Sequence, residues 1–299
     1  MLFSLQRKKV VMEWLSNYFQ AFLLEMLKGA ARGFFESLSG LTSEVTSLAN
    51  VDPGTFNPTL FSMIRTISDV AIVPVACLIL CYLMTINFIK IIQDKNTYKD
   101  MTFMPVFKWI LFTTIGIVLV TKTYTIVLAI FDVVGWILNK TGAIVSAGPA
   151  SIDLQTRLDE LVAAVDPTDM GNVFGLTVQL LLCKFMVGIV AILCKVCMYF
   201  RIISILVYSS AAAIPMATLM DSGQNQTGQN YLKNLAALGL QGFFTIMIVA
   251  IFEVLIADLA TRAGASIGSL VLNTLMYTLA LCLGLFSTKK VADVTLGAH

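Results

Sequence analysis

The stretch from residue 172 to residue 220 constrains the fold of this chain more than any other. It is almost continuously apolar, and its only formal charges are those of Lys184, Lys195 and Arg201. A transmembrane helix needs about 20 apolar residues to cross a hydrocarbon core of about 30 Å, so the stretch is long enough for two crossings. We predict a helical hairpin in a membrane, with its turn near Tyr199 to Arg201, where an aromatic ring and a guanidinium suit the headgroup level.

The composition of the whole chain also indicates a membrane protein. Apolar residues make up 58% of the 299 positions and charged residues 13%, while the formal net charge is +2. Soluble domains usually hold about 45–50% apolar and about 25% charged residues, so a soluble core would not bury this much apolar surface. We therefore predict an all-α, polytopic membrane protein with about six transmembrane helices, preceded by an amphipathic N-terminal helix.

The first 50 residues predict this amphipathic helix, continuous to about Leu38. Charged and amide side chains interrupt its sequence too often for a secretory signal, so we expect the segment to be retained. Its apolar side chains recur at helical spacing and include Leu15, Phe19, Phe22, Leu23 and Met26. Two interpretations stay open: the helix lies in the membrane interface, or it packs against copies of itself or a partner. The mixed charge of its polar side favours the second.

The predicted domain boundaries follow from the polar stretches. Residues 39–58 predict a loop because they are rich in Ser, Thr, Asn, Gly and Pro, and residues 51–68 are the hinge and lead-in to the membrane. Residues 69–299 are the transmembrane bundle. Within the bundle, residues 146–171 are acidic, and we expect them to form an exterior loop.

The first span is predicted from about Asp69 to Ile91, and Pro74 within it predicts a mild kink. The loop after this span is rich in lysine, so by the positive-inside rule it faces the cytoplasm and the N-terminus lies outside. From Val106 to Val145 the chain stays apolar, with one crossing ending near Val120. The remainder is the same helix continued beyond the bilayer, a re-entrant piece or a further span, and we favour the long helix that protrudes.

The last third of the chain leaves a conflict over its sidedness. Residues 221–230 predict a polar loop, and the last two spans are predicted at Ala236–Leu259 and Ile267–Phe286. Six crossings with the first loop inside would leave the C-terminus outside. Lys289 and Lys290 favour the opposite side. An odd number of crossings would remove the conflict.

No catalytic or metal-binding constellation is visible in the sequence. The only histidine is His299, and neither a phosphate-binding glycine loop nor a zinc-binding helix motif occurs. All six cysteines fall within predicted spans, where cysteine packs as a small apolar residue, and Cys194 and Cys197 lack the partners of a metal site. We expect a protein that is not an enzyme and that holds no metal or cofactor.

The ionisable residues within the spans are the candidate functional residues, because a charge in lipid costs about 2.5–3.5 kcal/mol on insertion scales. They are Asp132, Lys184, Lys195, Arg201 and Glu253. Lys184 and Lys195 are separated by about three helical turns and therefore share one face of a helix. That face either lines a polar passage or pairs with Glu253. The structural alternative is salt bridging between helices, or side chains that extend to the interface.

The layout of the chain, with its N-terminal amphipathic helix and proline-containing first span, resembles the TrbL family of conjugal transfer proteins. The resemblance is carried further by the stretch SSAAAIPMATLM at residues 209–220 and the stretch NYLKNLAALGLQGFF at residues 230–244. It implies a multi-pass subunit of the bacterial cytoplasmic membrane, in several copies, that helps to form the channel of a type IV secretion system. The partners it implies are further copies, other channel subunits, the ATPases of the system, membrane lipids and, transiently, the transferred single-stranded DNA.

A secondary transporter or small-solute permease is the alternative function. Such a protein would show internal repeats and interrupted helices in matching positions of two halves. No convincing repeat is visible, because the first 68 residues have no counterpart later in the chain.

Overall fold

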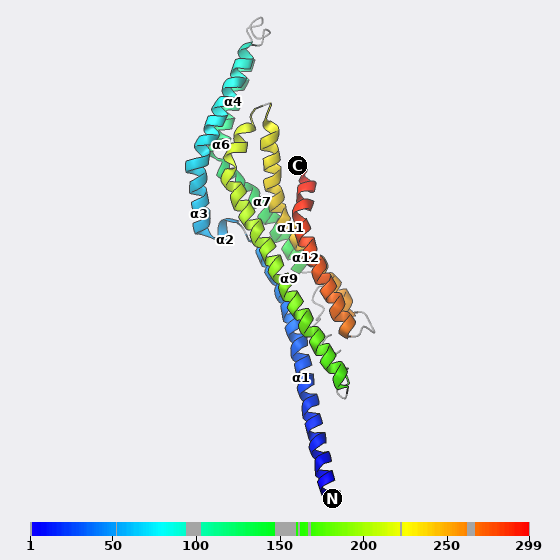
Figure 1. Ribbon diagram of the computed structural model, residues 1–299. Helices are drawn as coiled ribbons and strands as arrows, with labels where there is room; N and C mark the ends of the chain where they lie inside the picture. Colours follow the sequence, from blue (N-terminus) through cyan, green and yellow to red (C-terminus); the bar gives the residue numbers. More distant parts are fainter. Residues whose placement is uncertain are drawn as a thin grey trace. The chain divides into compact units, whose positions relative to one another are not determined.

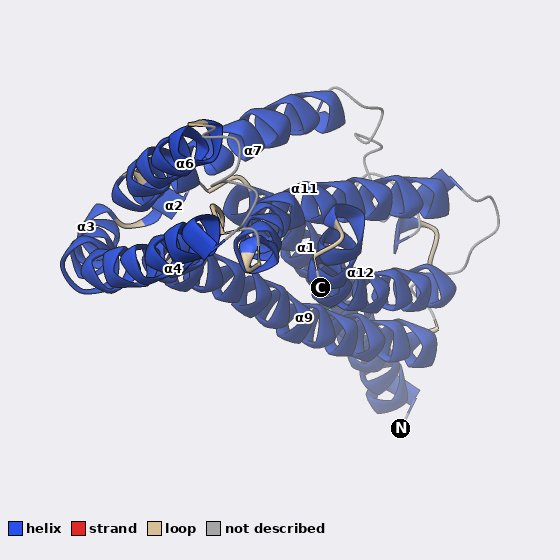
Figure 2. Cartoon of the chain, turned by 90° about the horizontal axis from the view of Figure 1, so that it is seen from above, coloured by secondary structure: helices blue, strands red, loops and turns tan. Residues whose placement is uncertain are grey.

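The structure is a computed structural model of the chain and describes residues 2–51, 53–93, 103–146, 160, 162–166, 169–221, 223–261 and 267–298. Its principal elements are all helices, as Figure 2 shows. In chain order they are α1 (Leu2–Ala49), α2 (Pro53–Phe56), α3 (Pro58–Ile67), the π-helical turn η1 (Ser68–Ile72), α4 (Val73–Gln93), α6 (Met104–Thr121), α7 (Thr123–Ser146), α9 (Met170–Ala211), α10 (Ala213–Thr218), α11 (Asn225–Thr261) and α12 (Ile267–Leu296).

Six helical segments of the described chain are long and apolar enough to cross a membrane. They are Pro58–Gln93, Met104–Thr121, Thr123–Ile144, Met170–Ala211, Asn225–Leu259 and Ile267–Leu296. Many of their apolar side chains are exposed on the single chain, for example Leu78 at 72% and Leu283 at 71%, as expected for residues that face lipid or other subunits. The predicted fold class, an all-α polytopic membrane protein, is confirmed.

The prediction of a hairpin at residues 172–220 is wrong, because this stretch forms one long helix. α9 continues through residues 199–201 without a turn, and Figure 1 shows it as one rod from green to yellow. Its 42 residues span about 63 Å, about twice the hydrocarbon thickness. α9 ends at Ala211, four residues before Pro215. In a regular helix the ring of Pro215 would clash with the carbonyl group of Ala211.

The predicted loop at residues 39–58 is wrong over its first half, because α1 continues to Ala49. The apolar spacing of the helix also continues, and Leu41 is 2% exposed. The hydroxyl groups in this stretch bond to the preceding turn; for example, Ser47 Oγ donates to the Glu44 carbonyl at 2.8 Å. Serine and threonine therefore do not end the helix here, because their hydroxyls find partners within it.

The first membrane-spanning segment is longer than predicted, because it is helical from Pro58 to Gln93. Asn57 caps its start, where the side chain accepts a bond from Leu60 N at 3.0 Å. The kink predicted at Pro74 takes the form of the π-helical turn Ser68–Ile72 directly before it. A proline ring crowds the carbonyl four residues earlier, and the wider π turn lies at that place.

Residues 104–146 form two helices, α6 and α7, that meet at Lys122. The backbone of Lys122 has φ −107° and ψ 16°. Lys122 N donates to Val118 O at 2.9 Å, and Ile126 N donates to Lys122 O at 3.1 Å, so hydrogen bonds bridge the break. The favoured prediction of one uninterrupted helix is wrong at this residue, where the chain bends without forming a loop.

The polar loop predicted at residues 221–230 is also shorter than expected, because α11 begins at Asn225. Asn225 N donates to the Asp221 carbonyl at 2.9 Å and so closes the first turn. α12 extends beyond the predicted end at Phe286 to Leu296. Much of the exterior loop predicted at residues 146–171 lies outside the described residues.

The chain divides into two compact units. Unit 1 contains Met1–Ser47, Ala143–Val196 and Met247–Phe286, and unit 2 contains Leu48–Gly142, Cys197–Ile246 and Ser287–His299. The most deeply buried side chains of unit 1 include Leu27 and Phe34 of α1 and Leu180 of α9.

Unit 2 contains two clusters of buried apolar residues. The first joins α4, α6 and α10 through Ala76, Leu80, Met84, Val120, Ala213 and Ala217. The second joins α7, the end of α9 and the start of α11 through Val127, Phe131, Ile205, Ala212, Leu235 and Leu238. The small residues Ala213 and Ala217 of α10 lie in the first cluster, which lets the backbone of α10 approach its neighbours closely.

Candidate functional site

Arg201 is the most deeply buried charged group among the candidates, with 3% of the residue exposed. Its guanidinium donates to three backbone carbonyl oxygens within unit 2. Nε donates to Leu238 O at 3.2 Å, Nη2 to Gly239 O at 3.1 Å, and Nη1 to Ala49 O at 3.2 Å. The planar fork of arginine can reach several acceptors at once, so the charge is solvated by the backbone instead of by water.

The backbone groups around Arg201 are suited to this role. Ala49 is the last residue of α1, and the final carbonyl groups of a helix lack partners within the helix. On α11, Gly242 leaves room for the guanidinium, since an added Cβ would lie 2.6 Å from Nη2. Arg201 therefore joins the end of α1 to α9 and α11. The predicted role of Arg201 at a turn is wrong, and the guanidinium instead lies inside the helix packing.

A cavity of about 360 Å³ lies beside Arg201, and Asp132 is among its lining residues. The other lining residues are Asn50, Val51, Phe131, Val134, Gly135, Trp136, Leu138 and Asn139. The ion pairs found among the described residues do not join Asp132 to Arg201. Asp132 is exposed, and the carbonyl groups remain the partners of the guanidinium.

The two lysines of α9 both lie toward α1 in unit 1, which confirms that they share one helix face. Lys195 Nζ forms an ion pair with Glu44 at 2.5 Å, with 38% and 47% of the two side chains exposed. The Lys184 ammonium lies over Gly33, where an added Cβ would be 2.5 Å from Nζ. Among the described residues, Lys195 thus pairs with α1 and not with Glu253.

Glu253 also lies toward α1, because its carboxylate interacts with the Thr42 side chain. Four of the intramembrane charges proposed for a polar passage therefore lie along one helix, α1. Lys184, Lys195, Arg201 and Glu253 each contact α1, through Gly33, Glu44, Ala49 and Thr42 respectively. This arrangement favours the structural interpretation, in which the charges hold helices together.

The pairs of contacts between α1 and α9 also give the relative direction of the two helices. Gly33 meets Lys184, Glu44 meets Lys195, and Ala49 meets Arg201. Residue numbers rise together on both helices, so α1 and α9 run parallel.

The residues predicted to form an oligomerisation helix separate into two groups. Leu15, Phe19, Phe22 and Met26 are 58%, 51%, 50% and 40% exposed, and we call these four residues the α1 stripe. Leu23 is 4% exposed and belongs to the buried side of the helix. The spacing in the sequence places all five on the apolar side of the helix, but it does not show which of them the rest of the chain covers.

Several polar contacts join helices, and their partners were not predicted from the sequence. Gln179 Nε2 donates to Gly268 O at 3.2 Å in unit 1, and Gln241 Nε2 donates to Thr288 Oγ1 at 3.2 Å in unit 2. Asn87 Nδ2 donates to Asp221 Oδ1 at 3.0 Å. An isolated Asn or Gln in an apolar helix could have indicated these contacts, because such side chains form hydrogen bonds between helices in membranes.

The described residues contain no group of three or more His, Cys, Asp and Glu side chains that could hold a metal ion. Cys194 is buried and Cys197 is partly buried. The expectation of no metal or cofactor stays a prediction.

Long apolar helices joined by a few buried polar contacts define this chain as a polytopic α-helical membrane protein. The family model described as TrbL/VirB6 plasmid conjugal transfer like protein matches residues 39–213, which is more than half of the 299-residue chain. The chain belongs to this family, and the resemblance predicted from the sequence is confirmed. No curated protein and no solved structure matches the chain.

Proposed function

We propose that this chain is a channel subunit of a conjugative type IV secretion system, which helps as a multimer to form the passage for DNA and protein across the bacterial cytoplasmic membrane. The family match over residues 39–213 carries this proposal, because the family is one of plasmid conjugal transfer proteins. The six apolar helical segments agree with a subunit that lies in the membrane. Its partners would be further copies, other channel subunits, ATPases, lipids and the transferred single strand, with no catalytic step in this chain.

The α1 stripe supports the proposed multimer. Its four side chains, 40–58% exposed, recur three or four residues apart on the N-terminal half of the helix. An apolar stripe of this spacing is suited to pack against another helix, and copies in a ring would present it repeatedly. The N-terminal halves of α1 would then lie together at one end of the assembly.

The proposed topology places the N-terminus outside and the C-terminus in the cytoplasm. α9 follows the acidic stretch 146–171, and α1 runs parallel to α9, so both begin on the same, exterior side. We infer that α6 and α7, which join end to end, cross the membrane as one element and that α9 crosses once, so that the chain would make five passes. Lys289 and Lys290 then lie on the cytoplasmic side, which agrees with the positive-inside rule.

The first test is transfer of the conjugative element that encodes the chain. Deletion of the gene should abolish transfer, and the wild-type chain supplied in trans should restore it. Substitution of the α1 stripe (L15S/F19S/F22S/M26S) should abolish this restoration without loss of the protein from the membrane fraction. The matched control is E25Q/K28Q, which changes exposed residues of the same helix outside the stripe, keeps the net charge and should restore transfer.

The second test is the copy number of the purified protein in nanodiscs, from native mass spectrometry and electron-microscope class averages. A ring of several copies for the wild type and for E25Q/K28Q, and single copies for the stripe variant, are the expected results. Monomers of the wild type with an enclosed cavity, together with unimpaired DNA transfer by the deletion strain, would contradict the proposal and favour a transporter.

A further inference from the structure

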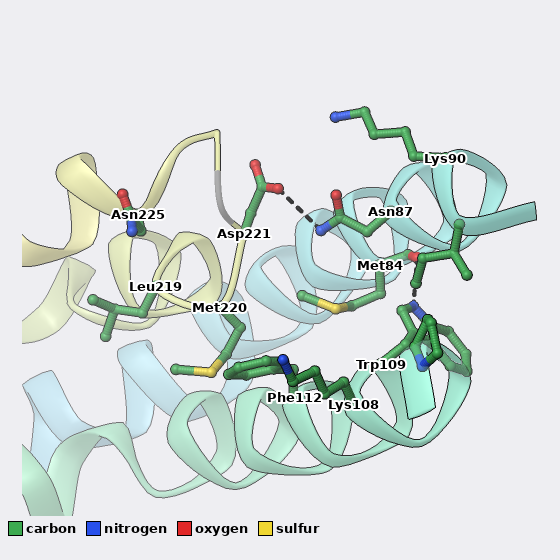
Figure 3. A pocket seen from close by; sticks show the side chains of 12 residues that line it. Met84, Asn87, Lys90, Lys108, Trp109, Phe112, Leu219, Met220, Asp221 and Asn225 are labelled. Carbon is green, nitrogen blue, oxygen red and sulfur yellow. Dashed lines mark hydrogen bonds between the residues drawn. The ribbon is translucent and has the colours of Figure 1, made fainter. Parts of the chain in front are cut away.

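A cavity of about 520 Å³ lies in unit 2 where three parts of the chain meet: the end of α4, the start of α6 and the turn between α10 and α11. Lys90 of α4 and Lys108 of α6 are among its lining residues, and both are exposed. Figure 3 shows Asp221 on the α10–α11 turn facing Asn87 on α4. Two exposed lysines and one carboxylate therefore line this cavity, and Figure 3 shows the Lys90 ammonium turned away from Lys108.

Hydrogen bonds tie the walls of this cavity together. Trp109 Nε1 of α6 donates to Met84 O of α4 at 2.9 Å, and Asn87 Nδ2 donates to Asp221 Oδ1 at 3.0 Å. Asp221 is 6% exposed although it carries a carboxylate. Asn87, Trp109 and Asp221 are thus held in place before any ligand arrives, which lowers the entropic cost of ordering this wall of the cavity.

The position of the cavity along the helices places it at the membrane surface. It lies at the last turns of α4, which ends at Gln93, and at the first turns of α6, which begins at Met104. Tryptophan is enriched at the headgroup level of membranes, and Trp109 lines the cavity there. Basic pockets between transmembrane helices at this level bind the headgroups of anionic lipids.

We propose that this cavity binds the phosphoglycerol headgroup of an anionic phospholipid. The exposed side chains of Lys90 and Lys108 would turn toward the phosphodiester oxygens and donate to them, and the two ammonium groups with one carboxylate leave one positive charge for a monoanionic phosphate. The Asp221 carboxylate has acceptor sites beyond the one used by Asn87, and a glycerol hydroxyl can donate to it. The apolar side chains of Phe112 and Met220 line the same cavity and would contact the start of an acyl chain.

The first experiment measures lipid retention by native mass spectrometry, using full-length protein released from nanodiscs that contain equal amounts of phosphatidylglycerol and phosphatidylcholine. The wild type should retain phosphatidylglycerol preferentially, and K90Q/K108Q should lose about tenfold or more of this retention, because each lysine near a phosphate contributes to binding. K122Q/K140Q is the matched control, since it removes two exposed lysines outside the cavity and should behave as the wild type. Equal retention of both lipids by the wild type, or unchanged retention by K90Q/K108Q, would overturn the proposal.

The second experiment keeps the lysines and therefore does not depend on the folding of K90Q/K108Q. The chain contains three tryptophans, and W14F/W136F leaves Trp109 as the only one. Phosphatidylglycerol with brominated acyl chains should quench Trp109 fluorescence more strongly than brominated phosphatidylcholine at the same mole fraction. Excess soluble glycerophosphoglycerol should not relieve this quenching. Equal quenching by the two lipids, or full relief by the soluble headgroup, would contradict a lipid site.

Discussion

Gly242 and Gly33 both lie against a cationic side chain, but the two side chains differ in their freedom to move. An added Cβ at Gly242 would lie 2.6 Å from Arg201 Nη2, 2.9 Å from its Cζ and 3.1 Å from Ala49 O. The guanidinium is held by three carbonyl oxygens and cannot retreat without losing them. At Gly33 the nearest atom is the end of the Lys184 side chain, at 2.5 Å, which is exposed and free to swing away.

We expect G242A to destabilise the protein by about 1–3 kcal/mol, the usual cost of overpacking a buried site. G33A should be close to neutral, because the lysine end can move and alanine favours a helix more than glycine by about 1 kcal/mol. Thermal unfolding of the two variants in the same detergent checks this difference. An equal loss of stability in G33A and G242A would show that the Arg201 contacts are not rigid.

Replacement of Arg201 tests how its buried charge is stabilised. R201K keeps a buried cation but loses the fork that reaches carbonyls on two helices, so much of the desolvation cost stays uncompensated. R201M removes both the charge and its desolvation cost. R201M also leaves few carbonyl groups without a partner. Leu238 O and Gly239 O lie within helix α11, and only Ala49 O is at a helix end. We expect R201K to unfold at a lower temperature than R201M. The reverse order would show that the desolvation cost of the lysine cation is smaller than the loss of the hydrogen bonds to the carbonyl groups.

At the scale of elements, the pairing of α1 with α9 organises the charged groups of the chain. The parallel register from Gly33–Lys184 to Ala49–Arg201 places these contacts along about a third of α1. The Glu44–Lys195 pair within it is partly exposed, so its Coulomb energy is screened by solvent.

A double-mutant cycle on Glu44 and Lys195 should give a coupling free energy of about 0.2–1 kcal/mol, as expected for an exposed pair. E44K and K195E should each lower the unfolding temperature, and E44K/K195E should recover most of the loss. High salt should reduce the coupling. Strictly additive losses would mean that the two side chains do not interact in the folded protein.

At the scale of the whole molecule, the number of membrane passes decides on which side each segment lies. The proposed five passes would place the residues around 103 and 224 in the cytoplasm and those around 166 outside, whereas a hairpin within α9 would place the residues around 166 and 224 on the same side. Because the first loop and the C-terminal lysines then share one side, the charge distribution of the chain is consistent with the positive-inside rule.

Single cysteines introduced into a background in which the six native cysteines are replaced should report this topology. D166C should react with a membrane-impermeant maleimide in intact cells, while F103C and Q224C should react only after the membrane is permeabilised. All three positions are exposed in the structure. Labelling of Q224C in intact cells would contradict five passes, and labelling of F103C in intact cells would contradict the N-terminus outside.

The sequence by itself determined the membrane-embedded, all-helical class and the family, because apolar runs of span length have few alternatives in a bilayer. It also determined that Lys184 and Lys195 share a helix face, since helical periodicity needs no tertiary information. It did not determine where α9 ends: Tyr199 and Arg201 are typical of a membrane surface, but Arg201 is equally suited to a buried site that supplies carbonyl acceptors.

The packing of the helices supplies these acceptors, because Ala49, Leu238 and Gly239 come from distant parts of the chain. The same holds for Leu23, which is covered while its neighbours in the α1 stripe are exposed. The cavity between Lys90, Lys108 and Asp221 likewise depends on the α10–α11 turn packing beside α4 and α6. Local sequence patterns specify helices and their faces, but the partner of a polar group is a long-range property, and it becomes visible only when the helices are packed.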